Sequence, residues 1–116
     1  MLNLSKNDIK KIEKLDKLIR LQELNLSFNC IAKIENLEAL TSLQVLNLNG
    51  NKIDIIPLWL ARKLKALRVF KIARNRIQSV SSFLVLSYFL KFLRIFFCIT
   101  FAVFPNSYLR ISVIDF

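Results

Sequence analysis

The 116-residue sequence contains no histidine, one glycine, two prolines and two cysteines. The absence of histidine excludes the commonest general base, the Ser-His-Asp triad and every zinc site that needs an imidazole. Few glycines and prolines, with 54% apolar residues, exclude a collagen-like or disordered chain. The sequence also lacks a carboxylate cluster, a nucleophile beside a base and a phosphate-binding glycine loop. These gaps predict a protein that is not an enzyme and that holds no metal or cofactor.

The two cysteines, Cys30 and Cys98, lie far apart and belong to no Cys-x-x-Cys pair. They provide no disulfide framework, which fits a reducing compartment. The opening residues, MLNLSKNDIKKIEKLDK, are too polar and too charged for a signal peptide. We therefore expect a cytoplasmic location.

The composition changes near residue 80. Residues 1–80 carry 15 basic and 7 acidic side chains, whereas residues 81–116 carry only 3 and 1. The second part holds eight of the ten phenylalanines, and nine of the ten asparagines precede residue 76. We predict a repeat domain over 1–80 and a hydrophobic, Phe-rich and helical tail over 81–116.

The first part repeats around four asparagines, at spacings of 22, 22 and 24 residues: Asn7, Asn29, Asn51 and Asn75. Before each asparagine stands an alternating apolar pattern such as Leu24-x-Leu26, which predicts a short strand with its leucines on one side. After each asparagine, apolar residues recur every third position, which suits a 3₁₀ or helical turn on the opposite side. One unit cannot bury its apolar face alone, so the units must stack.

This pattern, L-x-x-L-x-L-x-x-N-x-I-x-x-I-x-x-L-x-x-L, resembles the 22-residue intracellular class of the leucine-rich repeat family. The resemblance implies an α/β solenoid of about four repeats, the first incomplete, with parallel strands on a concave face and turns on a convex face. The four asparagines are then structural, because their amides hydrogen-bond the backbone of the turn and of neighbouring repeats. The third unit is longer and contains Pro57 and Trp59, which predicts a short convex helix with Trp59 as an apolar lid or a partner anchor.

Two runs, 11–35 and 56–77, resemble the N-terminal repeats of a centrosomal coiled-coil scaffold. The Pro-x-Trp-Leu insertion is the more particular part of this likeness, because the other matching positions are common to the repeat. The resemblance implies a cytoplasmic scaffold associated with the centrosome or midbody, and hence with the cytoskeleton and cell cycle. The long coiled coil of such a protein is absent from this chain.

The side chains that alternate with the inward leucines define a concave face that is polar and rich in amides. Its predicted partner-binding residues are Glu23, Asn25, Ser27, Val45, Asn47, Asn49, Val69 and Lys71. Amides and hydroxyls on a rigid platform suit a protein partner, whose identity the sequence does not give. The alternative is that these residues are solvated strand faces. We favour a non-catalytic protein–protein interaction module.

Seven basic residues between positions 62 and 76 have no acidic residue among them: Arg62, Lys63, Lys65, Arg68, Lys71, Arg74 and Arg76. Such a patch attracts nucleic acid, an anionic membrane surface or an acidic protein tail. No aromatic platform interleaves the charges, and no nucleic-acid motif is present. We expect a solvated basic face and no specific nucleic-acid partner.

Residues 83–104 contain 18 apolar residues among 22, a length that can span a bilayer. Fifteen Leu, Ile, Phe and Val side chains favour insertion by roughly 5 to 9 kcal/mol, against a cost of roughly 5 to 7 kcal/mol for Lys91 and Arg94. A membrane-associated protein anchored by 83–104 is therefore the alternative function. A helix that caps the solenoid is a third interpretation, although caps present a polar outer face. The abrupt change of pattern favours a truncated isoform or a fragment.

Overall fold

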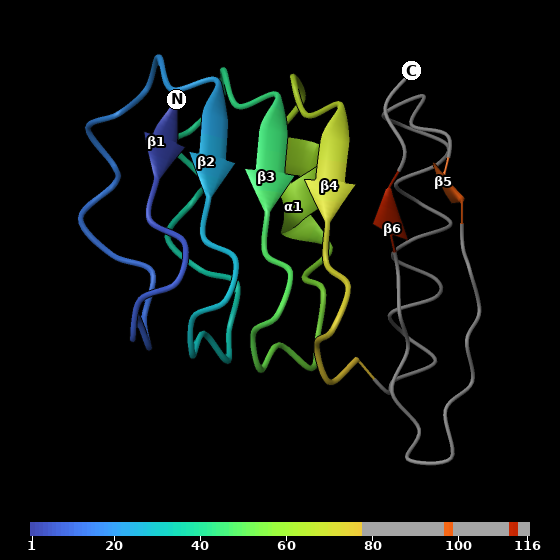
Figure 1. Cartoon of the computed structure of the whole chain (residues 1–116). Coiled ribbons are helices and arrows are strands. Elements are labelled where there is room, and N and C mark those ends of the chain that lie inside the picture. Colours follow the sequence, from blue (N-terminus) through green and yellow to red (C-terminus); the bar gives the residue numbers. More distant parts are fainter. Residues whose placement is uncertain (78–96, 99–111, 114–116) are drawn as a thin grey trace.

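The computed structural model describes residues 1–77, 97–98 and 112–113, and its main element is a four-stranded parallel sheet (Figure 1). The strands are β1 (Leu2–Asn3), β2 (Glu23–Asn25), β3 (Val45–Asn47) and β4 (Val69–Lys71). They lie in the order β1-β2-β3-β4, and the register pairs Leu24 with both Leu2 and Leu46, and Leu46 with Phe70. Each repeat thus contributes one strand, and the predicted parallel solenoid is confirmed.

The strands are built on the predicted alternation of side chains. Leu24, Leu46 and Phe70 point into the core and are 1%, 0% and 0% exposed. The inward residue that follows each of these strands, such as Leu48, is also buried. This core is continuous from Ile12 to Ile77, so each unit covers the apolar face of its neighbour.

The convex side consists of single turns and one helix. The turns are closed by backbone bonds between residues three apart, for example from Leu40 N–H to Leu37 O at 3.0 Å and from Leu43 N–H to Leu40 O at 3.1 Å. The longer third unit forms the predicted helix, α1 (Trp59–Lys63), behind the sheet in Figure 1. Pro57 lies just before α1, where its carbonyl accepts the Leu60 N–H at 3.2 Å and its missing N–H has no cost. Trp59 is partly buried against the core, as expected of an apolar lid.

One leucine of the repeat pattern in the first repeat lies largely outside the core. Leu18 is 40% exposed, whereas its counterpart in the second repeat, Leu40, is completely buried. The reason is the stack itself, because the turn that carries Leu18 has a neighbouring turn on one side only.

The described tail residues form a short antiparallel pair, β5 (Phe97–Cys98) with β6 (Ser112–Val113), and β6 lies beside β4 (Figure 1). Residues 97–98 are the described part of 83–104, and residue 80 lies outside the described residues. The predicted tail helix, the boundary at residue 80 and the capping and membrane-spanning interpretations therefore stay predictions. Among the described residues, no helix has the length and apolar character needed to cross a bilayer.

Candidate functional site

The repeated asparagines form a ladder that holds the base of the candidate surface. The Asn51 Nδ2 donates to Leu26 O and Leu48 O, both at 3.0 Å, and its Oδ1 accepts the Ile31 N–H at 3.1 Å. Asn29 and Asn75 repeat this arrangement and are buried. Asn7 is exposed and donates only within its own turn. In the buried ladder residues Asn29, Asn51 and Asn75, both the amide nitrogen and the amide oxygen are therefore bonded to the backbone.

The parallel register arranges the outward side chains in rows across the sheet. Asn3, Asn25, Asn47 and Lys71 are aligned in the middle row. A second row contains Glu23, Val45 and Val69. A third row, immediately after the strands, contains Ser5, Ser27, Asn49 and Ala73. Adjacent positions in a row are about 4.8 Å apart, the spacing of neighbouring strands.

The outward asparagines Asn25, Asn47 and Asn49 each accept a backbone N–H with the amide oxygen. The Asn25 Oδ1 accepts the Ser27 N–H at 3.0 Å and the Ser27 hydroxyl at 2.7 Å. The Asn47 Oδ1 accepts the Asn49 N–H at 3.1 Å. The Asn49 Oδ1 accepts the Ala73 N–H of the next repeat at 2.8 Å. These amides therefore have a structural role that the sequence pattern did not reveal.

Two of the predicted partner-binding residues are buried, so their predicted exposure is wrong. Ser27 is 4% exposed and its hydroxyl donates to Asn25 Oδ1, whereas Ser5 makes the same bond to Asn3 in the first repeat and is only half-buried. Val69 is 6% exposed on β4, the strand that lies beside β6. The other six predicted residues keep accessible surface: Glu23, Asn25, Val45, Asn47, Asn49 and Lys71.

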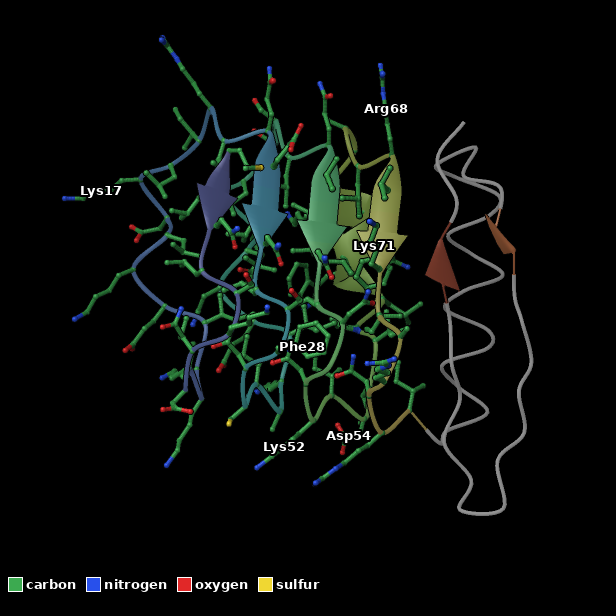
Figure 2. All side chains as sticks on the ribbon, in the orientation of Figure 1. Lys17, Phe28, Lys52, Asp54, Arg68 and Lys71 are labelled. Carbon is green, nitrogen blue, oxygen red and sulfur yellow. The ribbon has the colours of Figure 1, made fainter. Side chains whose placement is uncertain are left out.

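The concave face carries charges of opposite sign on two strands. Glu23 is exposed on β2, and Lys71 is exposed on β4 (Figure 2). Neither side chain has a hydrogen-bonding or ionic partner within the described part of the chain. Arg68 and Arg74, on either side of β4 in the sequence, are also exposed. The face is thus acidic toward β2 and basic toward β4.

An aromatic side chain that sequence reasoning did not single out lies at the rim of this face. The Phe28 side chain is 45% exposed. Its backbone is in the left-handed region, with a φ of 54°. The same left-handed conformation occurs at the matching positions Lys6, Gly50 and Arg74, so it belongs to the turn of the repeat. The Phe28 ring packs against Gly50 so closely that a Cβ there would lie 2.6 Å from Phe28 Cδ1. The Phe28–Gly50 pair fixes an exposed ring beside the strands (Figure 2).

We expect the substitution Gly50→Ala to lower the free energy of unfolding by about 2 kcal/mol, since alanine at positive φ costs about 1 to 2 kcal/mol and its methyl group displaces the ring. In a Phe28→Ala background the steric part disappears, so the loss should fall toward the backbone cost alone. Urea unfolding of the four chains of this cycle measures the coupling. Equal losses in both backgrounds would contradict the packing described.

The described residues offer no arrangement for metal chemistry. Among them, no group of three or more Cys, Asp or Glu side chains gathers in a way that holds a metal ion. Glu13, Asp16 and Glu38 line a shallow hollow together with Lys14, and this hollow opens to solvent on the side of the convex turns.

Comparison with known proteins agrees with the geometry. The family model described as Leucine Rich repeats (2 copies) matches residues 1–39 and 41–85. Among the solved structures that the chain resembles is an internalin from Listeria monocytogenes, with 27% identity and a TM-score of 0.58. That match covers 70% of this chain and 23% of the internalin, so the chain spans about a quarter of its length. No curated protein matches the sequence.

Proposed function

Because the chain belongs to the leucine-rich repeat family, we propose that it is a non-catalytic module that binds a protein partner through its concave face. The observation that carries the proposal is the set of accessible polar side chains held in register on a rigid sheet, with Glu23 on β2 and Lys71 on β4. Because the sheet holds these side chains in register, little conformational entropy is lost when a partner binds. Modules of this family generally bind other proteins, and we propose that this chain has no enzymatic activity.

The residues of the proposed surface are the six that remain accessible, with Phe28 at the rim. Val45 lies at the centre, between β2 and β4, and Asn47 is aligned with Lys71 in the next row. A bulky cation at Val45 would stand above the sheet and block a partner without entering the core, because Val45 points outward and Leu46 inward. Val45 is thus the position at which the proposal is tested most directly.

We expect Val45→Arg to remove most neighbours that proximity labelling with the full chain detects in cells. The matched control is Ala32→Arg, which adds the same side chain at an exposed position outside the strands. Labelling that depends on Val45 and not on Ala32 supports binding through the concave face. A neighbour set that is the same for the wild type and both variants would refute the proposal.

The finer assignment is to a cytoplasmic, centrosome-associated scaffold, of which this chain is a truncated isoform or fragment. It rests on the likeness of residues 11–35 and 56–77 to the N-terminal repeats of centriolin. The Pro57-x-Trp59-Leu60 insertion contributes the most, because the other matching positions are common to the repeat. The same labelling experiment tests this assignment, since centrosomal proteins should then be prominent among the neighbours.

A membrane-associated protein anchored by 83–104 is the second candidate, and the apolar content of that stretch favours it. Alkaline extraction of cell membranes separates the two candidates. Full-length chain that stays in the pellet, while a version with glutamates in place of Phe89 and Phe97 is extracted, would support anchoring. Complete extraction of both chains would support the scaffold.

A further inference from the structure

The accessible asparagines of the concave face have one kind of group left for a ligand. Their oxygens accept bonds from Ser27, Asn49 and Ala73. The Nδ2 groups of Asn25, Asn47 and Asn49 have no hydrogen-bond partner among the described residues. An amide nitrogen carries two N–H donors and no acceptor. The unpartnered nitrogens of these asparagines therefore offer hydrogen-bond donors to a ligand.

This orientation of the amides is required by chemistry. A backbone N–H can only donate, so the side-chain atom that it meets must be the oxygen. That condition applies at each of Asn25, Asn47 and Asn49, since each receives a backbone N–H. A flipped amide would place two donors against each other and would open the turn. The outward position of the Nδ2 groups is thus a property of the fold.

The middle row of donors ends in a cation. Asn25, Asn47 and Lys71 are aligned by the register, and Lys71 adds three ammonium donors with a positive charge. Arg68 and Arg74 are exposed on either side of β4 in the sequence. Donors to carboxylates form stronger, charge-assisted bonds than donors to neutral oxygens. The β4 end therefore suits carboxylates, and the β2–β3 part suits carbonyl oxygens.

We propose that the concave face recognises an acidic protein segment, with its carboxylates over β4 and its backbone carbonyls over Asn25, Asn47 and Asn49. The inference rests on the proposed protein-binding function and specifies its partner. Glu23 sets the direction, because it repels carboxylates from the β2 end of the same face. Phe28 offers an exposed ring at the rim for an apolar side chain of the segment.

A nucleic acid fits this face less well than a peptide. Its phosphates carry charge along the whole strand, so a nucleic acid that lies across the sheet would meet Glu23 as well as Lys71. The three neutral amides match the carbonyls that recur along a peptide chain. The experiment must therefore distinguish binding of an acidic peptide by the concave face from binding of nucleic acid by the basic residues alone.

The substitutions Asn25→Asp and Asn47→Asp test the proposal with little change to the fold. Each keeps the oxygen that accepts the Ser27 or Asn49 N–H, but replaces the two outward donors with a carboxylate oxygen. The new carboxylate at position 47 would also lie across the register from Lys71 and pair with it. We expect the double variant of the full chain to bind a fluorescent oligoglutamate peptide about tenfold or more weakly than the wild type.

The control variant is Lys17→Glu, which lowers the net charge by the same two units and projects away from the strands (Figure 2). Oligoglutamate affinity that falls for the double variant and is kept by the control supports the proposal. An equal loss in both variants would show general charge attraction and would overturn it, as would preferential binding of a DNA duplex that is insensitive to the two asparagines. If Val45→Arg removes the cellular neighbours while oligoglutamate fails to bind the wild type, the protein-binding function stands and the acidic partner is wrong.

Discussion

Replacing Asn51 with alanine is expected to lower the free energy of unfolding by about 3 to 5 kcal/mol, because four hydrogen bonds are lost at about 1 kcal/mol each. The Asn51 side chain bonds Leu26 O, Leu48 O and Asn49 O, and accepts the Ile31 N–H. It is only 7% exposed, so water replaces these bonds poorly. Urea unfolding of the full chain, followed by circular dichroism, measures the loss.

The lost bonds are not equal, and this difference allows a sharper test. Leu26 O also accepts the Asn29 Nδ2, and Asn49 O also accepts the Phe28 N–H, so these carbonyls keep one partner each. The Ile31 N–H loses its only hydrogen-bond partner among the described residues and becomes a buried unpaired donor. Asn51→Asp retains an oxygen for that N–H, but it sets a buried carboxylate oxygen against the carbonyls of Leu26, Leu48 and Asn49. It should therefore be at least as destabilising as Asn51→Ala.

Asn7→Ala is the matched control for the ladder. Asn7 occupies the same position in the first repeat but is exposed, and its Nδ2 bonds only Leu4 O and Ser5 O. We expect a loss of about 1 kcal/mol or less, because water can satisfy both carbonyls. Similar losses at positions 7 and 51 would contradict the structural role assigned to the buried ladder.

The sequence predicted the sheet well because the repeat imposes the same requirement four times. An inward residue such as Leu46 must match Leu24 and Phe70 in the adjacent units, so its burial follows from the period alone. The turns were predicted for the same reason, and α1 followed from the longer third unit with Pro57. The period alone does not predict burial in the first repeat, where a residue such as Leu18 has a neighbouring repeat on one side only and is exposed.

The concave face was less predictable, because a repeat period does not say what a polar side chain contacts. Asn25 and Asn29 are the same residue type in one unit, yet Asn29 is a buried ladder residue and Asn25 closes a local turn. Ser27 reads as an outward residue by alternation, but the chain has left the strand and the left-handed φ of Phe28 follows it. The alternation of buried and accessible side chains therefore does not extend beyond the strand to Ser27, which is buried like Leu26 before it.

The orientation of the amides depends on these same turns. Whether an outward asparagine offers a donor or an acceptor is decided by a backbone N–H two residues later or in the next repeat. No composition or spacing contains that information. The chemistry of the proposed partner is consequently an inference from the structure, whereas the presence of a polar concave face was an inference from the sequence.

Replacing Leu46 with alanine is expected to lower the free energy of unfolding by about 3 to 5 kcal/mol, the range for a buried leucine whose site cannot collapse. Leu46 lies in β3, is 0% exposed, and is flanked in register by Leu24 on one side and Phe70 on the other. A solenoid is stabilised by contacts between neighbouring units, so a cavity in β3 weakens two interfaces together. We expect urea unfolding to become less cooperative, with a lower denaturant dependence as well as a lower midpoint.

Leu18→Ala is the control for the same chemical change, because Leu18 is 40% exposed in the first turn. Its truncation removes little buried area, at roughly 25 cal/mol per Å², so a loss of about 1 kcal/mol or less is expected. Leu46→Val provides a variant that still folds if the alanine variant does not, since it removes one methylene and should cost about 1 kcal/mol. If Leu46→Ala and Leu18→Ala had equal effects, the sheet would not be the centre of one continuous core. If Leu46→Ala alone is strongly destabilising, β3 is the unit through which the two halves of the stack support each other.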